Sequence, residues 1–187
     1  MDAFSYLSVL LSVIIGLGIS QLLTSFGRLI RHRDIVRSYW PSLLWAGVLL
    51  LIFIQSWWAM FVLRHYTDWT FLAFAIVLLQ TIALYMMAAV VLPETVEEAG
   101  VDLRIHFEKH RRWIFGFLLI AVITSVVKDV ILYGRFADPA NLAFHAIFMV
   151  SCISAILVRG ARFHEFMAIV SAIAMGAYVA TLFARLQ

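Results

Sequence analysis

The sequence predicts an all-α integral membrane protein: a polytopic bundle of six transmembrane helices that forms one domain over residues 1–187. Hydrophobic residues make up 64% of the chain and charged residues 13%, whereas an ordinary soluble domain has about 45–50% and about 25%. Six largely apolar runs follow one another, each of about 20 residues, which is the length of helix that crosses a bilayer's hydrocarbon core. The composition excludes a soluble enzyme, a secreted disulfide domain and a disordered chain.

The six spans are expected at about 4–30, 41–63, 70–92, 113–133, 139–158 and 164–186. Pro41 and Pro139 suit the first turn of a helix, where the missing N–H costs nothing, and Asp138 before Pro139 is a good N-cap. Pro93 closes the third span. Because no proline lies inside a span, the helices should be unbroken, unlike the interrupted helices of many secondary transporters.

The basic residues predict the orientation of the chain. Ten of them lie in or beside the first, third and fifth connections, against Arg64, Arg135 and Arg185 on the other side. Since positive residues in short loops stay in the cytoplasm, both termini are expected on the outer side of the cell membrane. Three spans followed by three spans is compatible with an inverted 3+3 repeat, although the two halves show no convincing sequence similarity. The basic residues form no separate domain, so no nucleic-acid partner is expected.

Residues 93–112 form the only sizeable segment between spans and are expected as a cytoplasmic loop. Alternation at Val101, Leu103, Ile105 and Phe107 fits an extended stretch at the membrane surface. The rival interpretation starts a helix after Gly100, capped by Asp102, that runs into the fourth span. The helix is favoured slightly, because a strand here has no visible partner for its backbone.

Small residues recur every four positions in the first and last spans, so each set forms a stripe along one helix face. The stripes include Ser12, Gly16 and Ser20 in the first span and Ala172, Gly176 and Ala180 in the last. Two interpretations stay open: packing between helices of one subunit, or an interface in a homo-oligomer or with another subunit of a membrane complex.

Three ionisable residues fall inside predicted spans, and such groups are site candidates because charges in hydrocarbon are costly. They are Lys128, Asp129 and His145. Asp129 and His145 are each within about 10 Å of the outer ends of consecutive spans, so they are expected to pair, with Lys128 turned elsewhere or snorkelling. The alternatives are a structural ion pair and a proton- or ion-binding site reached from outside.

Further polar residues lie close to the expected midplane and extend this candidate ion or proton path. Gln55, Gln80 and the neighbouring pair Thr124 and Ser125 form a layer roughly 12–15 Å from the outer helix ends, and the pair continues the polar strip of Lys128 and Asp129 on the fourth span. Gln21 and Tyr85 would carry the path further inward, with Ser151 near the midplane of the fifth span. Ordinary interhelical hydrogen bonding remains the alternative explanation of such residues.

Motifs of membrane enzymes and cofactor proteins are missing from the sequence. A single cysteine excludes thiol relays, and one intramembrane aspartate without a zinc motif argues against intramembrane proteolysis. Only His145 is clearly inside a span, which disfavours paired-histidine haem ligation. No metal or other cofactor is therefore expected, and the protein is not expected to be an enzyme.

Three short motifs carry a resemblance: Gly27-Arg28-Leu29-Ile30 with Arg33, then Val36-Arg37-x-Tyr39-Trp40, then Gln55-x-Trp57-Trp58. With them, most of the chain resembles a family of short bacterial multi-span membrane proteins of uncharacterised activity. The resemblance implies a bacterial inner membrane and no ligand or site residues.

Two functions are therefore expected. The first is a small ion or proton channel, or a transporter, with an outer polar vestibule. The alternative is an accessory or scaffold subunit of a larger membrane complex, without transport or catalysis of its own. Membrane lipids are expected partners in either case.

Overall fold

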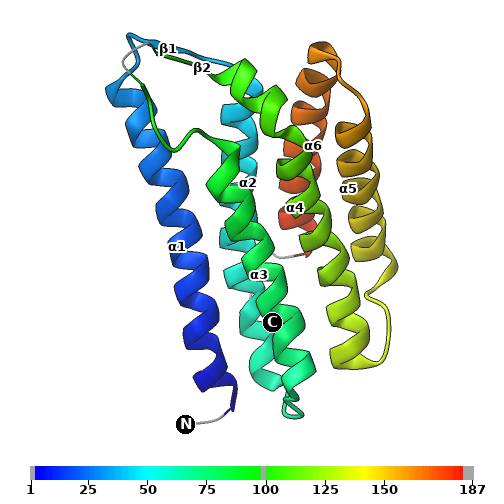
Figure 1. Ribbon diagram of the computed structural model, residues 1–187. Coiled ribbons are helices and arrows are strands. Elements are labelled where there is room, and N and C mark those ends of the chain that lie inside the picture. The colour runs from blue at the N-terminus through cyan, green and yellow to red at the C-terminus, as the bar shows by residue number, and fades with distance from the viewer. Residues whose placement is uncertain (1–2, 98–99, 183–187) are drawn as a thin grey trace.

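The computed structural model describes residues 3–97 and 100–182, and within these ranges the chain forms six α-helices (Figure 1). Each is long and apolar enough to cross a membrane, so the predicted all-α six-helix bundle is confirmed. The helices are α1 (Ala3–Arg31), α2 (Trp40–Ala59), α3 (Phe71–Val91), α4 (Leu103–Tyr133), α5 (Pro139–Leu157) and α6 (Ala161–Leu182). A 3-10 helix, η1 (Met60–His65), continues α2, and two short strands, β1 (Val36–Arg37) and β2 (Val101–Asp102), complete the described elements.

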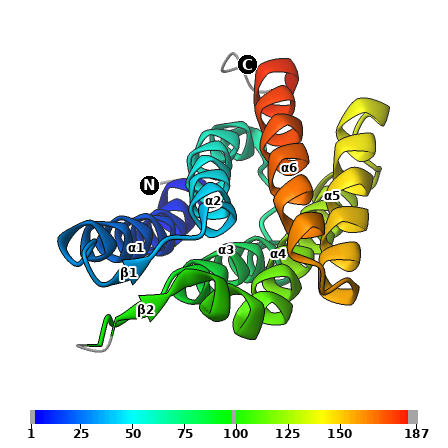
Figure 2. The same cartoon turned by 90° about the horizontal axis from the view of Figure 1, so that it is seen from above.

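Consecutive helices run up and down, so the first, third and fifth connections lie at one end of the bundle (Figure 1). Seen along the bundle in Figure 2, α2, α3, α4, α5 and α6 follow one another around a closed ring in which α6 returns to α2. Helix α1 packs outside this ring against α2 and α3. The ten basic residues of the three connections therefore lie toward one end, although the side of the membrane they face remains a prediction.

The two halves of the chain do not pack alike. In the first half α1 packs along α3, whereas the corresponding helices α4 and α6 meet at the His164 ring, whose centroid lies 5.4 Å from that of Phe107 and 6.0 Å from that of Phe115. The most extensive packing joins the halves instead, between α3 and α4. The arrangement gives no support to an inverted 3+3 repeat.

The core is built from large side chains near the middle of the bundle and toward the end that carries β1 and β2. Trp45, Phe53 and Phe115 are fully buried. The Trp45 and Phe115 rings pack edge to face with centroids 4.9 Å apart, a favoured geometry for aromatic pairs. Gly18 on α1 lies against the Phe53 ring so closely that an added Cβ would overlap it. This glycine lets α1 approach α2.

The segment between α3 and α4 differs from the expected loop 93–112, because α4 begins at Leu103 and its first turns belong to that segment. The Asp102 carboxylate caps the helix by accepting from Arg104 N at 2.8 Å and Ile105 N at 3.2 Å. The favoured helix interpretation is therefore confirmed. The expectation that an extended stretch here has no strand partner is wrong, because Val101 and Asp102 pair in parallel with Val36 and Arg37.

Gly100 allows this strand pairing to form. Its φ is +85°, a conformation that favours glycine. A Cβ at this position would also collide with the carbonyl oxygen of Ile35, which accepts a hydrogen bond of 3.2 Å from Val101 N. The turn thus places the chain directly against β1 before α4 starts.

The small-residue stripes face outward rather than into the bundle. Gly16 and Ser20 on α1 and Gly176 and Ala180 on α6 are exposed, while Ser12 and Ala172 are half-buried. The buried face of α1 is instead formed mainly by larger residues: Leu11, Ile15, Gly18, Leu22, Ser25 and Leu29. Packing within one subunit is therefore the wrong explanation for the four exposed positions. Residues 183–186 of the predicted last span, including Arg185, lie outside the described residues.

Candidate functional site

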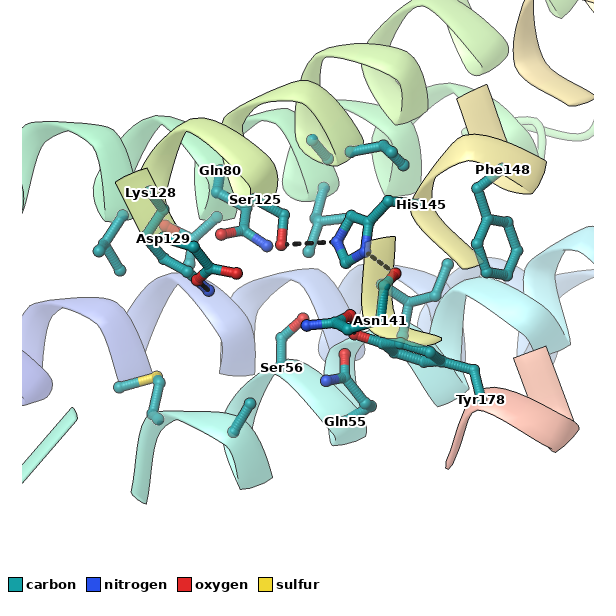
Figure 3. Close-up of a pocket in the computed structure, with 18 of the residues that line it drawn as sticks. Gln55, Ser56, Gln80, Ser125, Lys128, Asp129, Asn141, His145, Phe148 and Tyr178 are labelled. Atoms are coloured by element: carbon teal, nitrogen blue, oxygen red, sulfur yellow. Dashed lines mark hydrogen bonds and ion pairs between the residues drawn. The ribbon is translucent and has the colours of Figure 1, made fainter. Parts of the chain in front are cut away.

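One pocket, with a volume of about 260 Å³, collects polar and apolar side chains from every helix of the bundle, and we call it the polar pocket. All six residues of the predicted ion or proton path line it: Gln55, Gln80, Ser125, Lys128, Asp129 and His145. Figure 3 shows them converging from α2, α3, α4 and α5. The six residues that were grouped by their expected depth in the membrane therefore line the same cavity.

His145 is held in the pocket by α5 itself and by α4. Its Nδ1 lies 2.8 Å from the carbonyl oxygen of Asn141, one turn earlier on α5. Its Nε2 lies 3.0 Å from Ser125 Oγ on α4 (Figure 3). Because a carbonyl only accepts, Nδ1 carries the hydrogen, and in the neutral imidazole Nε2 accepts from the Ser125 hydroxyl. The ring is buried, with 8% of its residue surface exposed.

Lys128 and Asp129 form an ion pair on the last turns of α4. The Lys128 Nζ lies 4.0 Å from Asp129 Oδ1, and each side chain is 18% exposed. The expected pairing of Asp129 with His145 is wrong, because the imidazole nitrogens engage Asn141 and Ser125 instead. The expectation that Lys128 turns elsewhere is also wrong. Its four-carbon stem is long enough to bring the ammonium group back to the neighbouring carboxylate.

The two glutamines supply uncommitted polar groups. Gln55 of α2 and Gln80 of α3 both line the pocket, and within residues 3–97 and 100–182 no hydrogen bond engages either side-chain amide. An amide offers both donors and acceptors. The two side chains can therefore contact water, an ion or a small polar solute.

Asn141 and Tyr178 are pocket residues that the sequence analysis missed. The Tyr178 hydroxyl donates to Asn141 Oδ1 at 3.1 Å, and the Tyr178 ring packs edge to face on His145 at a centroid distance of 6.0 Å. The spacing of Asn141 four residues before His145 was a usable signal, since such residues share a helix face. Tyr178 gave no such signal within an apolar span, and Ser56 was also overlooked as a lining residue.

The expected inward continuation of the path is absent from the pocket lining in the described chain. Gln21, Tyr85 and Ser151 do not line it. Thr124, which was expected to extend the same polar strip, bonds to the carbonyl oxygen of Ile120 in its own helix at 2.8 Å. Beyond the pocket, toward β1 and β2, large buried side chains such as Trp45 and Phe115 fill most of the interior, together with a few buried polar residues that include Ser42 and His164. The pocket is therefore restricted to one half of the bundle.

The described residues contain no group of three or more histidine, cysteine, aspartate or glutamate side chains that could hold a metal ion. Cys152 is buried and free.

No protein-family model, curated protein or solved structure matches the chain.

Proposed function

We propose that the protein is a small ion or proton transporter, or a gated channel, whose polar pocket is the vestibule on the outer side. The observation that supports this most is the convergence of Lys128, Asp129 and His145 with the amides of Gln55 and Gln80 on one cavity. Ionisable groups at membrane depth are costly and commonly mark ion or proton pathways. A purely structural role would require no cavity around them.

The one-sided pocket favours alternating access or gating over a permanently open pore. An open pore would need a continuous water-filled passage across the bundle, whereas the pocket residues belong to one half of it. The fully buried Trp45 and Phe115 lie in the other half. A species bound in the pocket would therefore cross only after these helices move relative to one another.

The side chains suit capture of a cation or a proton. A cation entering the pocket would compete with the Lys128 ammonium for the Asp129 carboxylate, which are 4.0 Å apart. A proton can bind Nε2 of His145 if the Ser125 hydroxyl turns from donor to acceptor, because the oxygen has lone pairs to receive it. In both steps the rotation of one side chain replaces an existing contact of the pocket with a contact to the bound cation or proton.

Flux in proteoliposomes tests this proposal. Wild-type protein should move protons or a small ion down an imposed gradient, and Asp129→Asn or His145→Ala should abolish the flux or shift its pH dependence. Asp68→Asn is the matched control, because Asp68 lies in the connection before α3 and outside the pocket lining. Absence of flux above empty liposomes across a panel of ions, with folded and inserted protein, would contradict the proposal.

The outward small-residue stripes support a second candidate, an accessory or scaffold subunit. Gly16 on α1 has open space where a Cβ would stand, and Gly176 on α6 has the same. Helix association in membranes depends on small residues that let backbones approach. Under this alternative the pocket would stay dry and its polar groups would serve packing.

Substitution at the stripe tests this alternative. If α1 is an association face, Gly16→Leu should reduce the associated fraction of the protein in mild detergent, measured by crosslinking or light scattering. Gly47→Leu is the control, since Gly47 of α2 is also exposed with open space around it but lies off the stripe. An equal effect of both substitutions, or of neither, would contradict association through this face.

A further inference from the structure

A second cavity, of about 340 Å³, lies at the opposite end of the bundle from the polar pocket. Four cationic residues and one acidic residue line it: Lys109, Arg111 and Arg112 with Glu108 from the first turns of α4, and Arg159 just after α5. We call this cavity the basic pocket. Helix α4 begins and α5 ends at the end of the bundle that carries β1 and β2 (Figure 1), so the residues that line the basic pocket belong to that end.

Arg111 lies at the inner wall of the basic pocket and is 6% exposed. Its Nη1 donates to the carbonyl oxygens of Ala155, at 3.3 Å, and Val158. These carbonyls belong to the C-terminal end of α5, which carries about half a negative elementary charge. The helix end therefore holds the guanidinium in position but balances only part of its charge.

The lining of the basic pocket carries more positive than negative charge, with four cationic side chains against the one carboxylate of Glu108. The Glu108 carboxylate is engaged by Arg104, whose Nε lies 3.1 Å from Oε1. Across residues 3–97 and 100–182, none of the ion pairs joins a carboxylate to any of the four cations of the basic pocket. Arg159 and Arg112 both lie close enough to repel the charge of Arg111, and the attraction of the Glu108 carboxylate is smaller than either repulsion. Gathering several positive charges around one cavity is unfavourable unless an anion occupies it.

We propose that the basic pocket binds the phosphate group of an anionic membrane lipid. Arginine guanidinium groups match the geometry of phosphate oxygens and bind them through two parallel hydrogen bonds. Basic pockets at the cytoplasmic ends of transmembrane helices are suited to acidic head groups. This binding is separate from the proposed transport and does not depend on it.

Exposed apolar side chains beside the basic pocket favour a lipid over a soluble anion. Trp113 follows Arg112 and is 63% exposed, and Leu157 precedes Arg159 by two residues and is 72% exposed. Both belong to apolar helices of the bundle, where acyl chains would cover them. A lipid can therefore place its phosphate among the cations while its chains contact Trp113 and Leu157.

The test measures how much phosphatidylglycerol stays with the full chain after extraction from vesicles of phosphatidylcholine and phosphatidylglycerol, by native mass spectrometry. The pocket variant is Lys109→Gln with Arg159→Gln, which keeps Arg111 and therefore the end of α5. The control variant, Arg31→Gln with Arg33→Gln, removes the same charge from exposed positions at the same end of the bundle. Retention should fall about tenfold or more in the pocket variant, since each basic residue contributes about 1 kcal/mol.

Three results would overturn the proposal. Equal loss of phosphatidylglycerol in the pocket and control variants would indicate diffuse attraction to surface charge. Unchanged retention in the pocket variant would show that the bound lipid lies elsewhere. Displacement of the lipid by millimolar inorganic phosphate, with phosphate binding lost in the pocket variant, would assign the basic pocket to a free anion instead. Sedimentation of each variant as wild type shows that it is folded.

Discussion

The ionisable side chains of the polar pocket differ in how their charge is balanced. Lys128 and Asp129 neutralise each other at 4.0 Å, whereas His145 is satisfied by the Asn141 carbonyl and the Ser125 hydroxyl. In surroundings of low polarity, a charge whose partner is removed is much more costly than the absence of both charges. The pair should therefore behave as one unit in stability measurements.

A double-mutant cycle measures this coupling. Lys128→Met and Asp129→Leu should each lower the free energy of unfolding, and the double variant should recover part of that loss, with a coupling of about 0.5–3 kcal/mol. Unfolding in mixed detergent micelles, followed by circular dichroism, gives the values. Arg33 and Asp34 are the matched control, with atoms 3.9 Å apart but side chains 79% and 88% exposed. Coupling as weak at Lys128 and Asp129 as at this exposed pair would contradict the account.

At the scale of single helices, α1 shows why the buried face could not be identified from its sequence. Both faces of a transmembrane helix are apolar, because one meets protein and the other meets lipid, so periodicity gives no direction. The small-residue stripe suggested a packing face, yet Gly16 is exposed while Gly18, two residues later, contacts Phe53. The position of α2 determines which of the two glycines must lack a side chain.

The two glycines of α1 give a matched prediction. Gly18→Ala should destabilise the monomer by about 1–3 kcal/mol, because its Cβ overlaps the ring of fully buried Phe53. Gly16→Ala should be neutral or stabilising by up to about 1 kcal/mol, since nothing lies near its Cβ and alanine is the better helix former. Thermal unfolding in detergent under monomeric conditions compares them. Equal effects at the two positions would contradict the packing of α1 on α2.

The ends of helices were more predictable than their faces. Asp138 accepts from Ala140 N and Asn141 N, as its place before Pro139 predicted. Such caps depend on residues close in sequence. The pairing of β1 with β2 could not be foreseen in this way, because it joins Val36 to Val101. Two residues on each strand are too few to give a periodic pattern.

Considered as a whole, the molecule is a closed ring of five helices with α1 outside, enclosing a polar pocket toward one end. Length and composition predicted the six helices, and depth along each helix predicted six of the polar residues that share the pocket but not Asn141, Tyr178 or Ser56. Hydrogen-bond partners such as Ser125 for His145 could not be predicted, since they depend on how α4 and α5 are rotated against each other. The sequence also could not show that the pocket ends within the bundle, because apolar side chains that fill a core and those that face lipid have the same composition.

Whether water fills the polar pocket is the central question, and thiol accessibility at Ser56 answers it most directly. Ser56 lines the pocket, so Ser56→Cys in a Cys152→Ala background should react with a membrane-impermeant maleimide. The account predicts labelling only from the face that carries the α2–α3 connection, with Ser151→Cys, at a buried position outside the pocket lining, as the unreactive control. Failure of Ser56→Cys to react from either face would show a dry interior and contradict an aqueous vestibule.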